Sequence, residues 1–103
     1  MIRGTTPTHI FNLPFDTSLV ADLRIIYAQN DKEILVKKLE DCTLEGQSVS
    51  LILKEWETFL FDCSKKNVQI QLRVVTHNGE VLTSSIKTVS VDKCLNHEVL
   101  QWF

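Results

Sequence analysis

The chain has 103 residues and a mass of 11.8 kDa, which is the size of one domain with one hydrophobic core. Its 44% hydrophobic and 23% charged residues are typical of a globular domain and exclude disordered and collagen-like chains. A formal net charge of -2 excludes the basic surface of a nucleic-acid-binding protein and is too small for a mimic of DNA. We therefore predict one domain over residues 1–103.

The first half of the chain has the pattern of an edge strand followed by two hairpins. The first strand is bounded by Pro7 and Pro14, which places it at a sheet edge. The first hairpin turns at Asn30-Asp31, two residues that tolerate the left-handed backbone of a tight turn. The second turns at Glu45-Gly46-Gln47. The strands expected here are His9–Leu13, Leu23–Ala28, Ile34–Leu39, Cys42–Leu44 and Ser48–Leu53.

The second half contains the clearest strand of the sequence. Every second residue from Val68 to Val74 is apolar within the segment Asn67 to Thr76, which is typical of a half-buried strand. Asn78-Gly79 follows and predicts a two-residue type I′ turn, because both central residues of that turn need a positive φ. The next strand, Val81 to Val91, changes the phase of its apolar residues between Ile86 and Val89, which predicts a bulge or a bend.

Two segments have helical spacing instead. Lys54 to Phe61 places Trp56, Phe59 and Leu60 at i, i+3 and i+4, which predicts a short helical turn with Trp56 in the core. A C-terminal helix is expected after Asp92, with Leu95, Val99 and Trp102 on one face. About seven short strands joined by local hairpins predict an all-β fold, an antiparallel two-sheet β-sandwich of immunoglobulin-like type, and a small β-barrel fits the same pattern.

No motif for catalysis, cofactor binding or metal binding is complete. Three glycines are too few for a phosphate-binding loop. Cys94-Leu95-Asn96-His97 is half of a zinc site, and the Cys-x-x-Cys that would complete it is missing. Cys42, Cys63 and Cys94 are odd in number, which favours structural thiols in a reduced, cytoplasmic protein. We expect no enzyme, no cofactor and no metal, and we find neither a signal peptide nor a membrane helix.

Two groups of residues are candidates for partner binding. Glu40, Asp41 and Glu45 form an acidic group that, together with Glu55, Glu57 and Asp62, would suit a basic protein groove if all lay on one face. The simpler alternative is a solvated face neutralised by nearby lysines. Trp102-Phe103 ends the chain, and these aromatic side chains either dock on the domain or form an exposed anchor for a partner.

The opening Gly4-Thr5-Thr6-Pro7-Thr8-His9-Ile10-Phe11-Asn12-Leu13-Pro14-Phe15-Asp16, the segment from Val68 to Val74 and the Asn78-Gly79 turn resemble a family of small proteins encoded by prophages and other mobile elements of Firmicutes. Within that set the chain resembles type II-A anti-CRISPR proteins, which inhibit the RNA-guided nuclease of type II systems. The resemblance implies a monomeric, stoichiometric inhibitor in the cytoplasm of a bacterial host. Its target is the nuclease or its guide complex, reached directly or indirectly.

The same opening also resembles the N-terminal domains of phage baseplate proteins. That likeness implies a virion component, which would assemble into a symmetric ring through sheet edges or through Trp102-Phe103. Neither resemblance identifies which residues of this sequence contact a partner. The function expected from the sequence is therefore inhibition of type II-A interference without catalysis, and a baseplate or tail part is the alternative.

Overall fold

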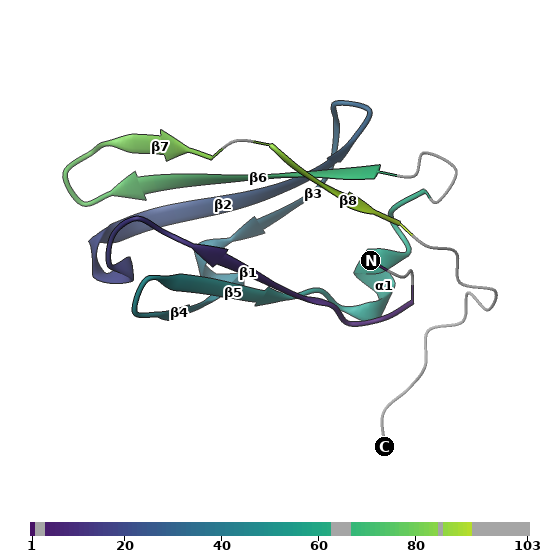
Figure 1. Ribbon diagram of the computed structural model, residues 1–103, viewed down its shortest axis with the longest axis horizontal. Helices are drawn as coiled ribbons and strands as arrows, with labels where there is room; N and C mark the ends of the chain where they lie inside the picture. The colour runs from purple at the N-terminus through teal and green to yellow at the C-terminus, as the bar shows by residue number, and fades with distance from the viewer. Residues whose placement is uncertain (2–3, 63–66, 85, 92–103) are drawn as a thin grey trace, which may run out of the picture.

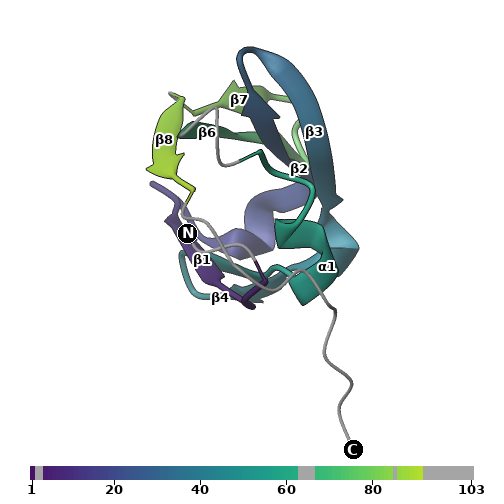
Figure 2. The same ribbon diagram turned by 90° about the vertical axis from the view of Figure 1, so that its right-hand side faces the viewer.

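Two antiparallel β-sheets packed face to face form the protein, so the predicted sandwich is confirmed (Figures 1 and 2). The computed structural model describes residues 1, 4–62, 67–84 and 86–91. The smaller sheet has the strand order β1 (Thr8–Asn12), β5 (Ser48–Ile52) and β4 (Thr43–Glu45). The larger sheet has the order β3 (Lys32–Lys38), β2 (Val20–Gln29), β6 (Asn67–Thr76) and β7 (Val81–Thr83), and β8 (Lys87–Ser90) also pairs with β6.

The core lies between the sheets and is built from the alternating residues of their central strands. A strand turns successive side chains to opposite faces, so each central strand sends every second residue inward, except at a bulge in β2 between Val20 and Asp22. The inward side chains from β2, β5 and β6 are Val20, Leu23, Ile25, Tyr27, Val49, Leu51, Val68, Ile70, Leu72 and Val74, all buried. Leu53 and Phe61, which lie outside these strands, also belong to the core and have no exposed surface. The strand predicted over 67–76 is thus confirmed residue by residue.

The tight turns follow the backbone preferences of their residues, with one exception. Asn30 and Asp31 both have positive φ, 51° and 62°, as the β2–β3 turn was predicted to require. The type I′ turn predicted at Asn78-Gly79 is wrong, because only Gly79 has a positive φ, 84°. The Gly79 N–H donates to the Thr76 carbonyl at 3.0 Å, which makes a three-residue loop with a glycine bulge. The Thr76 hydroxyl stabilises this longer loop by accepting the Glu80 N–H at 3.2 Å.

The strand predicted over Val81 to Val91 is two strands, so the described chain has eight rather than about seven. Thr83 lies opposite Arg73 and Lys87 opposite Ile70, a shift of one residue in register along β6. The predicted irregularity is therefore present, but it lies between Thr83 and Lys87, at the junction of β7 and β8, and not between Ile86 and Val89. Ser84 holds the junction, since its N–H donates to the Leu72 carbonyl at 2.8 Å and its hydroxyl accepts the Leu72 N–H at 2.9 Å.

The helical turn predicted after β5 is present as α1 (Glu55–Thr58), but the prediction of its buried face is wrong. Trp56 is 51% exposed, whereas Glu57 is 1% exposed and Thr58 is fully buried. The reason is that Glu57 pairs with the Lys37 ammonium of β3, and this ion pair turns that face of α1 inward. The C-terminal helix predicted after Asp92 lies outside the described residues.

Candidate protein-binding site

Several polar side chains in the interior of the domain have hydrogen-bond or ion-pair partners there. The His9 imidazole Nδ1 and the Tyr27 hydroxyl lie 2.8 Å apart, and Glu57 forms an ion pair with Lys37. Gln29 bonds the Asp62 backbone twice, through its amide N–H and its carbonyl oxygen, at 2.8 Å each. Burial raises the pKa of Tyr27, with smaller contributions from Cys42 and Glu57, so its hydroxyl stays protonated.

These paired groups stabilise the fold and do not converge on an open cavity. Burial lowers the pKa of His9, and the positive N-terminus adds to this effect, so the neutral imidazole is favoured. Burial is also the main reason that the pKa of the Cys42 thiol rises to about 11, which disfavours the reactive thiolate. Within the described residues, no three His, Cys, Asp or Glu side chains gather closely enough to hold a metal ion.

The acidic residues singled out from the sequence lie at the surface around η2 (Leu39–Asp41) and β4. The Asp41 carboxylate accepts the Lys38 N–H at 3.0 Å and so closes the η2 turn. Glu40 is exposed and lines a surface hollow of about 380 Å³ together with Arg24 and Lys38, so its surroundings have mixed charge. Glu45 is exposed at the hairpin end of β4, opposite Ser48.

The two acidic groups do not form one exposed face, because Glu57 of the second group is buried beside Lys37. Glu55 on α1 is partly exposed, and Asp62 is exposed. The other partner-binding candidates from the sequence, Trp102 and Phe103, lie outside the described residues.

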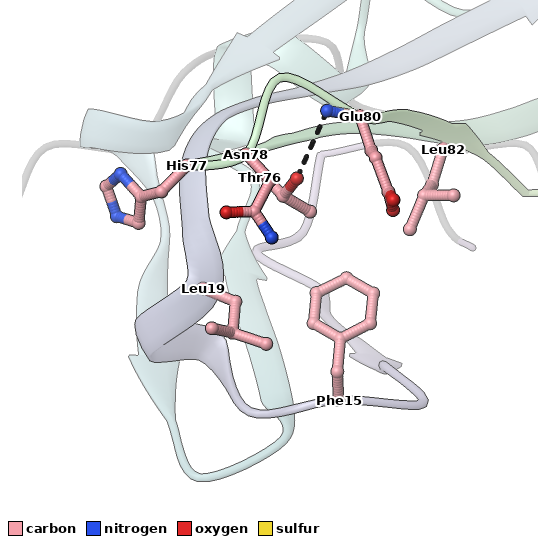
Figure 3. Close-up of a pocket in the computed structure, with 7 residues that line it drawn as sticks. All are labelled: Phe15, Leu19, Thr76, His77, Asn78, Glu80 and Leu82. Atoms are coloured by element: carbon pink, nitrogen blue, oxygen red, sulfur yellow. Dashed lines mark hydrogen bonds between the residues drawn. The ribbon is translucent and has the colours of Figure 1, made fainter.

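A small apolar cavity lies at one end of the sandwich, between η1 (Thr17–Leu19) and the β6–β7 hairpin (Figure 3). Its volume is about 140 Å³. Phe15, Leu19 and Leu82 supply its apolar walls, and Figure 3 shows the Phe15 ring facing the side chains of Glu80 and Leu82. The remaining lining residues are polar and come from the hairpin: Thr76, His77, Asn78 and Glu80.

Hydrogen bonds from backbone and side-chain groups hold η1 in place beside the β6–β7 hairpin. The Thr17 N–H and hydroxyl both donate to the Gly46 carbonyl at 2.8 Å, which fastens η1 to the β4–β5 turn. The His77 N–H donates to the Leu19 carbonyl at 3.0 Å and ties η1 to the β6–β7 loop. Asp16 caps the turn by accepting the Ser18 N–H at 2.9 Å. The cavity is therefore preformed, which reduces the entropic cost of binding.

The strand β7 forms an open edge beside this cavity. On either side of β7, the Thr76 N–H donates to the Glu80 carbonyl and the Ser84 N–H donates to the Leu72 carbonyl. Because hydrogen-bonded pairs alternate along an antiparallel ladder, Leu82 is the residue of β7 that turns its N–H and C=O toward β6, opposite Val74. The N–H and C=O groups of Val81 and Thr83 consequently point away from β6. Glu80 and Leu82 lie on the inner face, opposite the buried Thr76 and Val74, and both are exposed enough to contact a partner.

The size of the cavity selects the class of occupant. Pockets for small organic ligands measure roughly 300–1,000 Å³, whereas a dry cavity of about 150 Å³ accommodates one benzene ring. At about 140 Å³, this cavity matches one apolar side chain of a partner protein. Exposed apolar surface continues around it, since Leu19 is 48% and Leu82 41% exposed.

Sequence reasoning missed this site because its walls come from distant segments. Phe15 and Leu19 are far in the chain from Glu80 and Leu82, and only the fold brings them together. One local signal was present, since the period of a strand places Glu80 and Leu82 on the same face.

Comparisons with known proteins find a similar fold. No family model matches the chain, and no curated protein matches it in sequence. Among solved structures, the chain is similar to CopC from Methylosinus trichosporium OB3b, with a TM-score of 0.56 over 92% of this chain and 85% of that chain. The two sequences are 11% identical, so this likeness concerns the fold alone. No helix in the described part of the chain has the length and apolar character that crossing a bilayer requires.

Proposed function

We propose that the protein is a non-catalytic inhibitor of type II-A CRISPR-Cas interference and that it acts by binding a protein component. The observation that carries the binding mode is the preformed apolar cavity of about 140 Å³ beside the open β7 edge. Its dimensions suit a side chain, and its exposed apolar rim is typical of a protein contact. The choice of target rests on the resemblance of the opening, Gly4 to Asp16, to anti-CRISPR proteins.

The charge distribution favours a route other than imitation of DNA. A DNA mimic needs dense negative charge where phosphates would lie. The chain has a formal net charge of -2, and Arg24 and Lys38 stand beside Glu40. We propose that the inhibitor acts in the cytoplasm of the bacterial host, where it binds the nuclease, its guide complex or a factor that loads it.

The test is a plasmid-targeting assay in bacteria that carry an active type II-A nuclease and guide, with and without the protein. The same cleavage is then repeated with purified nuclease, guide and DNA. Protection in both settings supports direct inhibition, and protection in cells alone supports an indirect route. The proposal is contradicted if the plasmid is lost from the cells and the DNA is also cleaved in the purified reaction, although folded protein is present in both.

A second candidate function, a baseplate or tail part, is favoured by the β1 edge. The Leu53 N–H donates to the Pro7 carbonyl, and the Leu13 N–H donates to the Gln47 carbonyl. Because hydrogen-bonded pairs alternate along the ladder, the N–H and C=O groups of Thr8, Ile10 and Asn12 face away from β5. β1 contains no Asp, Glu, Lys or Arg to discourage pairing with another strand.

Ile10 also adds 64% exposed apolar surface on the outer face of that edge. Light scattering over a range of protein concentrations distinguishes the two functions. A closed ring supports the virion part, and a monomer at every concentration supports the inhibitor.

A further inference from the structure

We infer that β7 and its cavity recognise an extended segment of a partner protein, which carries an apolar side chain and, two residues away, a Lys or Arg. The inference rests on the proposed function in one respect, namely that the protein acts by binding another protein. Three features of the edge support it: free backbone groups, a cavity on the correct face and an acidic group at the correct spacing.

The backbone of β7 is ready to accept another strand. Val81 and Thr83 direct their N–H and C=O groups away from β6, and the strand carries no proline or lysine that would prevent pairing. By contrast, the edge strand β3 carries Lys32 and Lys38, which discourage pairing with another strand. Its pairing with β2 also shifts register between Tyr27 and Ala28. An added segment that bonds Val81 and Thr83 extends the larger sheet by one strand.

The register of such a segment places one of its side chains in the cavity. The partner residue opposite Leu82 forms a non-hydrogen-bonded pair, in which the side chains of the two strands approach most closely. Residues directly opposite each other in neighbouring strands share a face, so its side chain would lie on the face of Leu82. Figure 3 shows that Phe15 and Leu19 lie across the cavity from the β6–β7 hairpin. The volume of about 140 Å³ suits Leu, Ile, Met or Phe at that position.

Glu80 determines the charge of the neighbouring position. It lies two residues before Leu82 on the same inner face, and its exposed carboxylate lines the cavity. The cavity lining contains no Lys or Arg, so this carboxylate gives the site negative charge. A partner residue two positions from the apolar one faces Glu80, and Lys or Arg there complements it.

The experiment uses the full-length protein and a fluorescent nine-residue peptide of Ser and Thr that carries one Leu and one Arg two positions apart. A matched peptide of identical composition moves Arg next to Leu, which turns the two side chains to opposite faces of an extended strand. We expect saturable binding of the first peptide, measured by fluorescence anisotropy. Binding to the second should be about tenfold weaker, the loss of one good contact.

Backbone amide spectra of the protein locate the bound peptide. The amide signals of Val81 and Thr83 should shift on binding, while those of Lys32 and Lys38 on the β3 edge should stay in place. Shifts centred on another edge, or equal binding of the two peptides, overturn the inference. So does displacement of the bound peptide by a peptide of this chain's own residues 92–103, or by a second copy of the protein.

Three variants probe the same contacts one at a time. Leu82→Thr removes the apolar wall, Glu80→Gln removes the charge, and Thr83→Pro removes an outward N–H that makes no bond within the sheet. Each should weaken binding about tenfold or more. Val81→Thr is the matched control on the same strand, since its side chain lies on the outer face opposite Val75. The control should bind as the wild type does.

The plasmid-targeting assay separates failure of this inference from failure of the proposed function. If the wild type protects the plasmid and Leu82→Thr and Glu80→Gln protect equally well, the inhibitor stands and the β7 site is refuted. If the wild type protects nothing but the peptides bind with the expected preference, the proposed target is wrong and the recognition site stands.

Discussion

Replacement of Glu57 by Ala should cost about 3–5 kcal/mol of unfolding free energy, because it breaks a buried ion pair from one side. The Glu57 side chain is 2% exposed and that of Lys37 12%, so both charges are largely shielded from water in the folded protein. The substitution leaves the Lys37 ammonium buried without its counterion. It also removes the acceptor of the Lys54 N–H, which lies 2.8 Å from the Glu57 carboxylate. Since small domains are stable by only about 5–15 kcal/mol, this loss is easily measured.

Urea denaturation followed by circular dichroism is the assay, with the slope m compared between variants. Lys37→Met combined with Glu57→Leu removes both charges, so the double variant should recover most of the loss. Asp22→Asn is the matched control, because the Asp22–Arg24 pair is exposed, and it should leave stability within error of the wild type. A loss below about 1 kcal/mol for Glu57→Ala would show that the pair is hydrated and refute the argument.

Three further predictions follow from single residues. The lowered pKa of His9 means that the unfolded chain binds more protons, so stability should fall as the pH drops below 6.5, and His9→Gln should flatten this dependence in thermal melts at pH 5–8. Gly79→Ala should lower the unfolding free energy by about 1 kcal/mol in urea denaturation, because the φ of 84° is unfavourable for a residue with a side chain. The added Cβ meets no other residue within 4 Å beyond its chain neighbours, so backbone strain is the cause, and an unchanged midpoint would contradict the positive φ. In a variant that carries Cys63→Ser and Cys94→Ser, Cys42 is the remaining thiol. It should react with iodoacetamide far more slowly than glutathione does at pH 8, because burial raises its pKa to about 11. Equal reaction rates would refute the burial of Cys42.

Local patterns predicted the strands and most turns because these depend on neighbouring residues. The alternation from Val68 to Val74 predicts a strand with one buried face, and the second sheet of the sandwich buries that face. Asn30 and Asp31 tolerate the left-handed backbone by themselves, so their turn was predictable. Asn78-Gly79 was not, since the Thr76 hydroxyl stabilises a longer loop, and its effect is invisible in the dipeptide.

The errors concern contacts between distant segments. The spacing of Trp56 predicted a buried aromatic residue, but the ion pair from Glu57 to Lys37 on β3 turned the other face of α1 inward. Nothing near Glu57 in the sequence identifies that lysine. The cavity has the same character, because Phe15 meets Leu82 only through the packing of η1 against the β6–β7 hairpin. Composition and periodicity carry no information on such pairings, and the resemblance to phage proteins named no contact residue.

The most direct test of the account is the dependence of plasmid protection on the ratio of this protein to the type II-A nuclease in the same cells. A stoichiometric inhibitor protects once its level matches that of its target, and protection disappears when that target is overproduced. We predict this titration for the wild type and a shift to higher protein levels for Leu82→Thr. Full protection at a small fraction of the target's level would indicate turnover and contradict binding as the mechanism, and no protection at any ratio would contradict inhibition itself.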